Sequence, residues 1–286
     1  MGSNGVNQIA IEYGATPDFT VLMAVYGGDD PRLFGDALTS LFGNTMQPKT
    51  VIIVVDGPVT SELAGVLSDF EIKYTQLKII KLKQNQGLTL ALNQGLANVM
   101  TEWVARADAD DINLPDRFER MFAKISELNG SVDIIGSAID EVDTDGTKIT
   151  ARVLPASHDQ IVNFAIRRNP FNHMTTVFRT ELAKRVGGYP DLYGREDYGL
   201  WAKMISAGAR CNNLTESTVR ATTGTKFFER RGGFRYACGE YQLQKLLVEC
   251  GQKKIKQAII DGGLRGLVFA LPVGIRRIIY EKILRC

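Results

Sequence analysis

Three carboxylates stand close together in the stretch ARADADDINLPDR. Asp108, Asp110 and Asp111 fall within four consecutive positions, directly after the apolar run WVARA at residues 103–107. Carboxylates at this spacing repel one another and resist ionising together, so we expect a positive group beside them. Divalent hard cations such as Mg²⁺ and Mn²⁺ prefer carboxylate oxygens and are commonly shared between one or two Asp side chains and substrate phosphates. The alternative is a solvated turn that caps a helix near Pro115. Three acids in four positions at one strand end favour the metal site.

A second pair of acids, Glu196 and Asp197, lies in the stretch GREDYGLW. Acids at the start of a helix cap it and interact well with its dipole, which explains one of the two. Two adjacent acids beside Arg195, with Trp201 following, could instead form an acceptor site with a catalytic base. A partly desolvated carboxylate there would have a pKa high enough to accept a hydroxyl proton. The residues alone leave the cap and the base equally open.

Alternating apolar runs and helical patterns predict the elements that position these acids. The predicted strands are residues 19–26, 51–55, 77–82 and 103–107. Helices are predicted between them, one beginning at Pro31 and one presenting Leu88, Leu92, Leu96 and Val99. This order predicts an α/β fold, with a mostly parallel, Rossmann-like sheet and helices on both faces.

Polar residues follow each of these four strands. They are Tyr26 with Gly27, Asp56, Asn85 with Gly87, and the acids from Asp108 to Asp111. Ligands of parallel sheets bind outside the carboxyl ends of the strands, so we expect these residues to converge on one crevice. The chain lacks both the GxGxxG and the GxxxxGK[ST] fingerprints, which leaves a nucleotide bound through a metal.

The second half of the chain has a more mixed pattern. Residues 132–153 predict two strands joined by an Asp-Gly turn at residues 143–146. That turn also explains Asp143-Thr144-Asp145 better than a second acid site does. We expect a strand at residues 175–178, a helix at residues 198–207 and helices beyond Phe234.

The composition is that of a soluble globular protein. The chain has 286 residues, of which 44% are hydrophobic and 23% charged. Its four cysteines form no CxxC pair and cluster with neither histidine, which argues against zinc and disulfides and suits a reducing cytosol. No apolar stretch approaches the roughly 20 residues that span a bilayer, and the first residues lack secretory and myristoylation patterns.

The basic character of the chain is concentrated at its end. Residues 251–286 hold eight basic and two acidic residues, a net charge of +6; since the whole chain carries +2, the remainder carries −4. Apolar residues share one helical face, with basic residues on the other side: Leu264, Leu267, Val268 and Leu271, then Ile275, Ile278 and Ile279 after Pro272, against Arg265, Arg276, Arg277, Lys282 and Arg285. Such a segment can lie in an anionic membrane interface. The alternative is a C-terminal helix packed on the catalytic domain or on a partner subunit.

Several motifs in one order give the chain a family resemblance. FTVLMAVYGGDD, VIIVVDGP, KQNQGLTLALNQGL, ARADADDINLPDR, NPFNHMTTVFR, GGYP and REDYGLW together resemble a family 2 glycosyltransferase with the GT-A fold. The resemblance covers roughly residues 19–221. It is closer to bacterial enzymes that build capsule, exopolysaccharide or O-antigen repeat units.

The resemblance implies roles on the donor side. Asp108 and Asp110 match the DxD motif, which positions ribose and metal-bound diphosphate, and Asp111 matches an additional acid beside them. The remaining donor-side positions are Asp56, which matches the acid that recognises uracil, Ala24 and Tyr26, which line the base site, and Asn85 and Gly87 at the third strand end. Gly27-Gly28 departs from the usual residues of the first loop and leaves its donor contacts open.

On the acceptor side, Asp197 matches the general base of the ED motif, with Glu196 as its neighbour. His173 matches a position near the active site, although a buried hydrogen-bonded histidine is an equally good interpretation. Arg195 and Trp201 are assigned to the acceptor side.

The resemblance thus implies an inverting, Mn²⁺- or Mg²⁺-dependent transferase that moves a hexose or N-acetylhexosamine from a UDP-sugar to a glycan hydroxyl. The expected acceptor is linked to undecaprenyl diphosphate, which places the enzyme in the cytoplasm at the inner face of the membrane, without a nucleic-acid partner. We expect an irregular segment at 1–18, a catalytic domain at 19–225, divided into a nucleotide-sugar half at 19–112 and an acceptor half at 113–225, and a basic helical extension at 226–286.

Two other functions remain to be weighed. A sugar nucleotidyltransferase uses a similar sheet, a metal and a nucleotide, but needs a glycine-rich basic loop that AVYGGDDP does not provide. A non-catalytic binding module of the same fold is the second alternative, against which Asp108, Asp110 and Asp197 speak.

Overall fold

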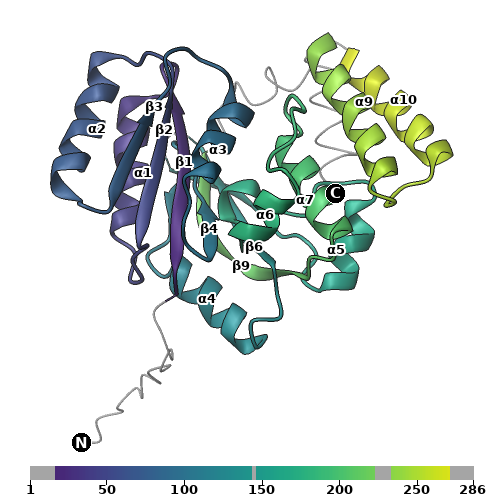
Figure 1. Cartoon of the computed structure of the whole chain (residues 1–286), viewed down its shortest axis with the longest axis horizontal. Coiled ribbons are helices and arrows are strands. Elements are labelled where there is room, and N and C mark those ends of the chain that lie inside the picture. Colours follow the sequence, from purple (N-terminus) through teal and green to yellow (C-terminus); the bar gives the residue numbers. More distant parts are fainter. Residues whose placement is uncertain (1–16, 144–145, 223–232, 271–286) are drawn as a thin grey trace, which may run out of the picture.

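The computed structural model describes residues 17–143, 146–222 and 233–270. Within them the chain forms one nine-stranded sheet with helices packed against it (Figure 1). The strands are β1 (Phe19–Tyr26), β2 (Thr50–Asp56), β3 (Leu77–Lys81), β4 (Trp103–Arg106), β5 (Ile112–Asn113), β6 (Ile134–Val142), β7 (Lys148–Arg152), β8 (Val177–Arg179) and β9 (Cys211–Thr222). The helices are α1 (Pro31–Phe42), α2 (Ser61–Lys73), α3 (Leu88–Ala97), α4 (Arg117–Glu127), α5 (His158–Ala165), the 3₁₀ helix η1 (His173–Thr175), α6 (Thr180–Arg185), α7 (Glu196–Ser206), α9 (Phe234–Glu249) and α10 (Ile255–Ala270).

The sheet has the strand order β3-β2-β1-β4-β8-β6-β9-β5, with β7 paired to β6. Strands β1 to β4 pair in parallel, and so do β6 and β9. The antiparallel pairs are shorter and all involve strands of the second half, β5 to β9. The predicted mostly parallel sheet is confirmed, and the mixed second half is the part that departs from it.

Helices cover both faces of this sheet. Along β1, Val21 and Met23 pack in an apolar cluster with α1, α2 and α4, whereas Leu22 packs in a second cluster with α3, α6 and α7. Successive side chains of a strand point to opposite faces, so a strand covered on both sides needs an unbroken apolar run. The sequence FTVLMAVY supplies that run.

The C-terminal helices α9 and α10 lie side by side at one end of the molecule (Figure 1). Helix α9 packs on α7 through a small apolar cluster that contains Leu192, Tyr198, Leu243 and Leu247. The segment for which the sequence left open membrane contact or packing on protein begins later, at Leu264, and this packing of α9 does not decide between the two. The tail beyond Ala270, on which part of the membrane prediction falls, lies outside the described residues.

One residue of the predicted membrane face is turned inward. Arg265 donates from Nη1 to Glu240 Oε1 at 2.9 Å, and its side chain is 21% exposed. Its assignment to the basic polar side of a membrane-binding helix is therefore corrected. In the described part of the chain, no helix combines the length and apolarity that crossing a membrane requires.

Candidate active site

The loops that follow β1, β2 and β3 meet at one edge of the sheet. Tyr26 and Asp56 are opposite each other in the register of β1 and β2. Gly57 has φ of +86°, and a Cβ there would lie 2.4 Å from the backbone nitrogen of Asn85. Only glycine allows this approach, since an added Cβ would both clash and strain the backbone. The structure thus brings together the residues that the strand ends predicted.

Asp56 links two of these loops. Its Oδ1 accepts a hydrogen bond from the backbone nitrogen of Gln86 at 2.7 Å, and its Oδ2 accepts one from Gly87 at 2.8 Å. The side chain is buried at the end of β2. Asp56 therefore fixes the loop that leads into α3, and either carboxylate oxygen retains a lone pair for a further donor.

Tyr26 and Ala24 differ in how accessible they are. Tyr26 is 42% exposed at the end of β1, and a Cβ on Gly28 would lie 2.5 Å from its ring. Ala24 is partly buried on the face that packs against α3. The ring of Tyr26 thus lies over the glycine pair of the first loop, which any larger residue at Gly28 would displace.

The positive group that the acidic stretch requires is Arg106, the last residue of β4. Arg106 is 1% exposed, and its Nη2 lies 2.5 Å from Asp108 Oδ1. Asp108 and Asp110 are both partly exposed, whereas the residues on either side of them are buried. A buried charge requires a partner, so Arg106 and Asp108 hold each other in place.

Asp111 has a different environment from its two neighbours. It is 4% exposed, and its Oδ1 accepts a hydrogen bond from the backbone nitrogen of Thr222 at 2.9 Å. Burial, followed by the charges of Asp108 and Asp110, holds the pKa of Asp111 well above its usual range. The hydrogen bond with Thr222 ties the acidic loop to the end of β9. That Asp111 is a third metal ligand stays a prediction.

Asp108 and Asp110 have the properties that one kind of metal site requires. Among the described residues, no group of three or more His, Cys, Asp or Glu side chains is arranged to hold a metal ion. A Mg²⁺ or Mn²⁺ site completed by substrate phosphates and water needs only one or two carboxylates. The reachable carboxylates of Asp108 and Asp110 have the donor chemistry for such a site.

Asp197 lies in the first turn of α7 and is held by a side chain distant in sequence. Its Oδ2 accepts a hydrogen bond from Asn169 Nδ2 at 2.6 Å, and its Oδ1 accepts one from the backbone nitrogen of Tyr198 at 2.7 Å. The side chain remains partly exposed. Two donors fix the orientation of this carboxylate while leaving it partly exposed.

Glu196 is nearly buried beside it. Burial, and then the charge of Asp197, raise the pKa of Glu196 to about 7. The positive charge of Arg106 acts against this shift, which places Arg106 within electrostatic range of Glu196. The two acid groups that the sequence identified separately, 85 to 89 positions apart, therefore belong to one electrostatic environment.

His173 is a partly buried residue of η1. Its Nε2 is 3.1 Å from the hydroxyl of Tyr189, and burial, helped by the charge of Arg106, holds its pKa well below the usual range. This contact fits the hydrogen-bonded histidine that the sequence offered as one interpretation, and the place of His173 in the site stays a prediction.

Two residues assigned to the acceptor side have other contacts. Trp201 is 0% exposed and packs edge-on against Phe171 and Phe178 in the core. Arg195 directs its guanidinium to Glu240 of α9. Trp201 is enclosed in the core and Arg195 is paired with α9, so these contacts do not support the acceptor-side assignment of either residue, which stays a prediction.

Sequence reasoning missed Arg106, Asn169, Tyr189 and Glu240. Of these, Arg106 could most easily have been found from the sequence, because a single charged residue inside the apolar run WVARA needs a buried partner. The other three act through contacts between distant segments and leave no local pattern.

The sequence model of the glycosyl transferase family 2 matches residues 20–185. The chain belongs to this family. It is a glycosyltransferase, and the family match decides against the sugar nucleotidyltransferase.

Named relatives of this family-2 chain align over nearly its full length. UDP-Gal:alpha-D-GlcNAc-diphosphoundecaprenol beta-1,3-galactosyltransferase of Escherichia coli is 37% identical over 271 residues, which cover 94% of this chain and 98% of the relative. The amylovoran biosynthesis glycosyltransferase AmsE of Erwinia amylovora is 33% identical over 264 residues, which cover 92% and 98%.

Solved structures share the fold of this family-2 chain. S. aureus TarS 1–349 in complex with UDP-GlcNAc aligns with a TM-score of 0.65 and 18% identity, over 90% of this chain and 77% of that one. The mannosyltransferase PcManGT from Pyrobaculum calidifontis, in complex with GDP-Man and Mn²⁺, aligns with a TM-score of 0.60 and 16% identity, over 94% and 80%. At these identities the likeness concerns the fold, which is the predicted GT-A fold.

Proposed function

We propose that this glycosyltransferase moves a hexose or N-acetylhexosamine from a UDP-sugar to a hydroxyl of an undecaprenyl-diphosphate-linked glycan, with inversion at the anomeric carbon. The proposed donor and acceptor rest on one observation, the 37% identity, over 94% of the chain, to the E. coli galactosyltransferase. The name of that relative states both its donor and its acceptor lipid. The relative from E. amylovora supports the same setting of surface polysaccharide synthesis.

The donor end of the site consists of the first three strand ends and the acidic loop. Ala24 and Tyr26 line the uracil, Asp56 accepts a base N–H, and Asn85 and Gly87 complete the donor site. A bound Mn²⁺ or Mg²⁺, held by Asp108 and Asp110, would offset the charge of the departing UDP. Arg106 keeps Asp108 in position through their ion pair.

The acceptor end supplies the base. Asp197 takes the proton of the attacking hydroxyl, since Asn169 and the amide of Tyr198 fix its carboxylate. The hydroxyl attacks the sugar from the face opposite UDP, which inverts the configuration, as a base does in the inverting glycosidases. Glu196, whose pKa is raised to about 7, keeps the charge beside Asp197 low near neutral pH.

Helix α10 offers a surface for the lipid side of the acceptor. Five of its apolar residues are each at least 60% exposed and recur at helical spacing: Ile255, Ile259, Ile260, Leu264 and Leu267. A contiguous apolar face of this kind, next to basic residues, suits an anionic membrane interface. We therefore place the enzyme at the cytoplasmic face of the membrane, with α10 directed to the lipid.

A transfer assay tests this function. The protein is incubated with UDP-glucose, UDP-galactose, UDP-GlcNAc or UDP-GalNAc, with Mn²⁺ or Mg²⁺, and with a synthetic lipid-diphosphate-GlcNAc acceptor. We expect UDP release with one of these donors, and a product whose new glycosidic bond is inverted by NMR. A retained configuration, or no transfer from any of the four donors, contradicts the proposal.

A further inference from the structure

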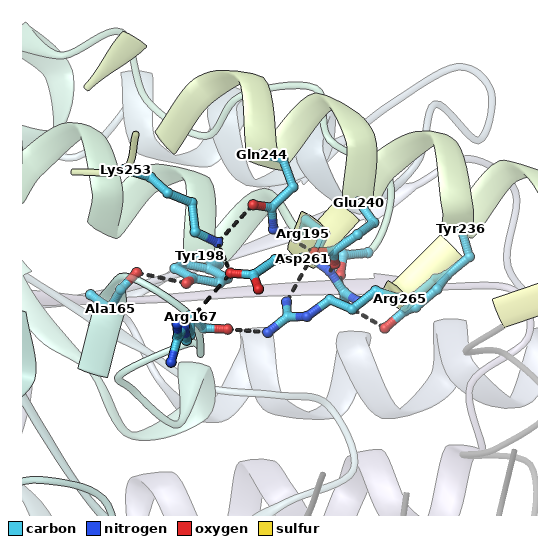
Figure 2. A network of polar contacts seen from close by, with 11 residues as sticks. Ala165, Arg167, Arg195, Tyr198, Tyr236, Glu240, Gln244, Lys253, Asp261 and Arg265 are labelled. Atoms are coloured by element: carbon cyan, nitrogen blue, oxygen red, sulfur yellow. Dashed lines mark hydrogen bonds and ion pairs between the residues drawn. The ribbon is translucent and has the colours of Figure 1, made fainter. Parts of the chain in front are cut away.

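A chain of buried charges joins the C-terminal helices to the segment that carries Asp197 (Figure 2). Its centre is Glu240 of α9, whose side chain is 1% exposed. Glu240 Oε2 lies 2.8 Å from Arg195 Nε, and Glu240 Oε1 lies 2.9 Å from Arg265 Nη1 of α10. Gln244 adds a third donor at 2.7 Å.

The carboxylate of Glu240 remains charged despite its burial. Burial alone raises its pKa, but the charges of Arg195 and Arg265 outweigh it, and the pKa lies below the ordinary value. A buried ion is tolerated only when its partners satisfy it, and losing the Glu240 carboxylate leaves the partly buried guanidinium groups of Arg195 and Arg265 without their shared counter-charge. The three side chains therefore act as one unit.

The first arm of this unit reaches Asp197 from its N-terminal side. Arg195 is the N-cap residue of α7 and lies two positions before Asp197. Besides Glu240, its guanidinium bonds the hydroxyl of Tyr236 and stacks over that ring, at 4.4 Å from the centroid. The helix start that carries the base is thus anchored to α9, not to a cap of its own.

The second arm reaches the same carboxylate from the opposite side. Arg265 donates from Nη2 to the backbone oxygen of Arg167. Two positions later, Asn169 donates to Asp197 Oδ2. Arg195, two positions before Asp197, and Asn169, which donates to Asp197, are therefore both linked to Glu240. Arg195 is linked directly, and Asn169 through Arg265 and the backbone of Arg167.

Two glycines bring the backbones close enough for these contacts. A Cβ on Gly239 of α9 would lie 2.3 Å from the backbone oxygen of Tyr193, and a Cβ on Gly194 would lie 2.8 Å from the ring of Tyr236. Gly194 also has φ of +66°, which other residues rarely adopt. The helix is packed against the loop before α7 without space between them.

We propose that Glu240 is a positioning residue for the transfer reaction: through Arg195 and Arg265 it sets the orientation of the Asp197 carboxylate toward the acceptor hydroxyl. This inference rests on the proposed role of Asp197 as the base. It assigns α9 and α10 a part in catalysis, in addition to any contact with lipid.

A double-mutant cycle of Glu240 and Asn169, measured by transfer kinetics, tests the positioning role of Glu240. Glu240→Gln keeps the shape of the side chain and removes its charge. We expect kcat to fall about tenfold or more, because small displacements of a catalytic group are costly, while UDP affinity and the KM for the donor stay unchanged. If Glu240 and Asn169 act through the same carboxylate, the loss in the double variant Glu240→Gln/Asn169→Ala is smaller than the product of the two single losses.

The controls separate positioning from general stability. Glu249→Gln lies on the same helix in an exposed pair with Lys245 and should keep the wild-type kcat. If Glu240→Gln does not fold by circular dichroism, Tyr236→Phe, which removes only the hydroxyl that faces Arg195, takes its place in the cycle. A wild-type kcat in the folded variant, a loss that multiplies with Asn169→Ala, or a matching loss of UDP affinity overturns the inference. Transfer by Asp197→Asn within a few-fold of wild type overturns instead the proposed base, and so identifies which proposal has failed.

Discussion

The proposed donor end and the proposed base end of this site are held in two different ways. At the donor end, successive parallel strands end side by side, so chain order itself brings Tyr26, Asp56 and Asp108 to one edge. At the base end, Asp197 depends on Asn169, 28 positions away, and on Glu240, a member of a separate helical pair. The difference teaches that donor binding is a property of the sheet, whereas base orientation is a property of tertiary packing.

The largest expected effect separates chemistry from binding. Asp197→Asn keeps the size of the side chain and removes the proton acceptor, so we expect transfer to fall about 10³-fold. Asp191→Asn, an exposed acid in the same segment, is the matched control. Transfer within a few-fold of wild type, measured as labelled product, would assign the base to another group.

At the donor end, Asp110→Ala removes one reachable carboxylate from the acidic loop. We expect a loss of about 10²-fold in transfer, because a charge that supports the leaving group is removed. UDP release over a range of Mn²⁺ concentrations measures it. The exposed Asp116→Ala serves as control, and an Asp110→Ala enzyme with wild-type metal dependence removes this residue from the metal site.

A smaller effect on kcat is expected from Asn169, which holds Asp197 at the proposed base end. Asn169→Ala leaves Asp197 in place but removes the 2.6 Å donor to its Oδ2, and we expect kcat to fall by about tenfold to a hundredfold with an unchanged KM for the donor. Asn163→Ala, exposed on α5, controls for the loss of an amide. A change in the donor KM alone would place Asn169 at the wrong end of the site.

The smallest effect concerns stability. The pKa of Glu196 is raised from an ordinary 4.5 to about 7, so between these values the folded state binds more protons than the unfolded state. The contribution of Glu196 to the free energy of unfolding therefore falls as pH rises through this window, by no more than about 3 kcal/mol. Urea unfolding of Glu196→Gln at several pH values should lack this fall. Parallel pH curves for variant and wild type would contradict the assignment.

The same contrast explains what the sequence could predict. The buried runs from Phe19 to Arg106 and the acids after them follow from strand periodicity and from the rule that ligands bind at strand ends. The sequence could not predict that Asp108 is partly exposed and Asp111 buried, because the position of a residue in a loop does not tell which side chain turns inward toward Thr222. The contacts of Arg195 and Trp201 did not follow for a similar reason, since their partners come from α9 and from the core.

The membrane prediction shows the same limit. Its helical periodicity correctly placed Leu264 and Leu267 on an exposed face. It could not foresee that Arg265 is drawn inward by Glu240, since ion pairing between helices leaves no trace in the pattern of one helix.

Titration of UDP in the presence of Mn²⁺, compared between wild type, Asp197→Asn and Asp110→Ala, is the most direct test of the two-region account. We predict that calorimetry gives the same affinity for wild type and Asp197→Asn, although the latter transfers sugar about 10³-fold more slowly, and a clear loss of affinity for Asp110→Ala. Loss of UDP binding in Asp197→Asn together with intact binding in Asp110→Ala would contradict the account.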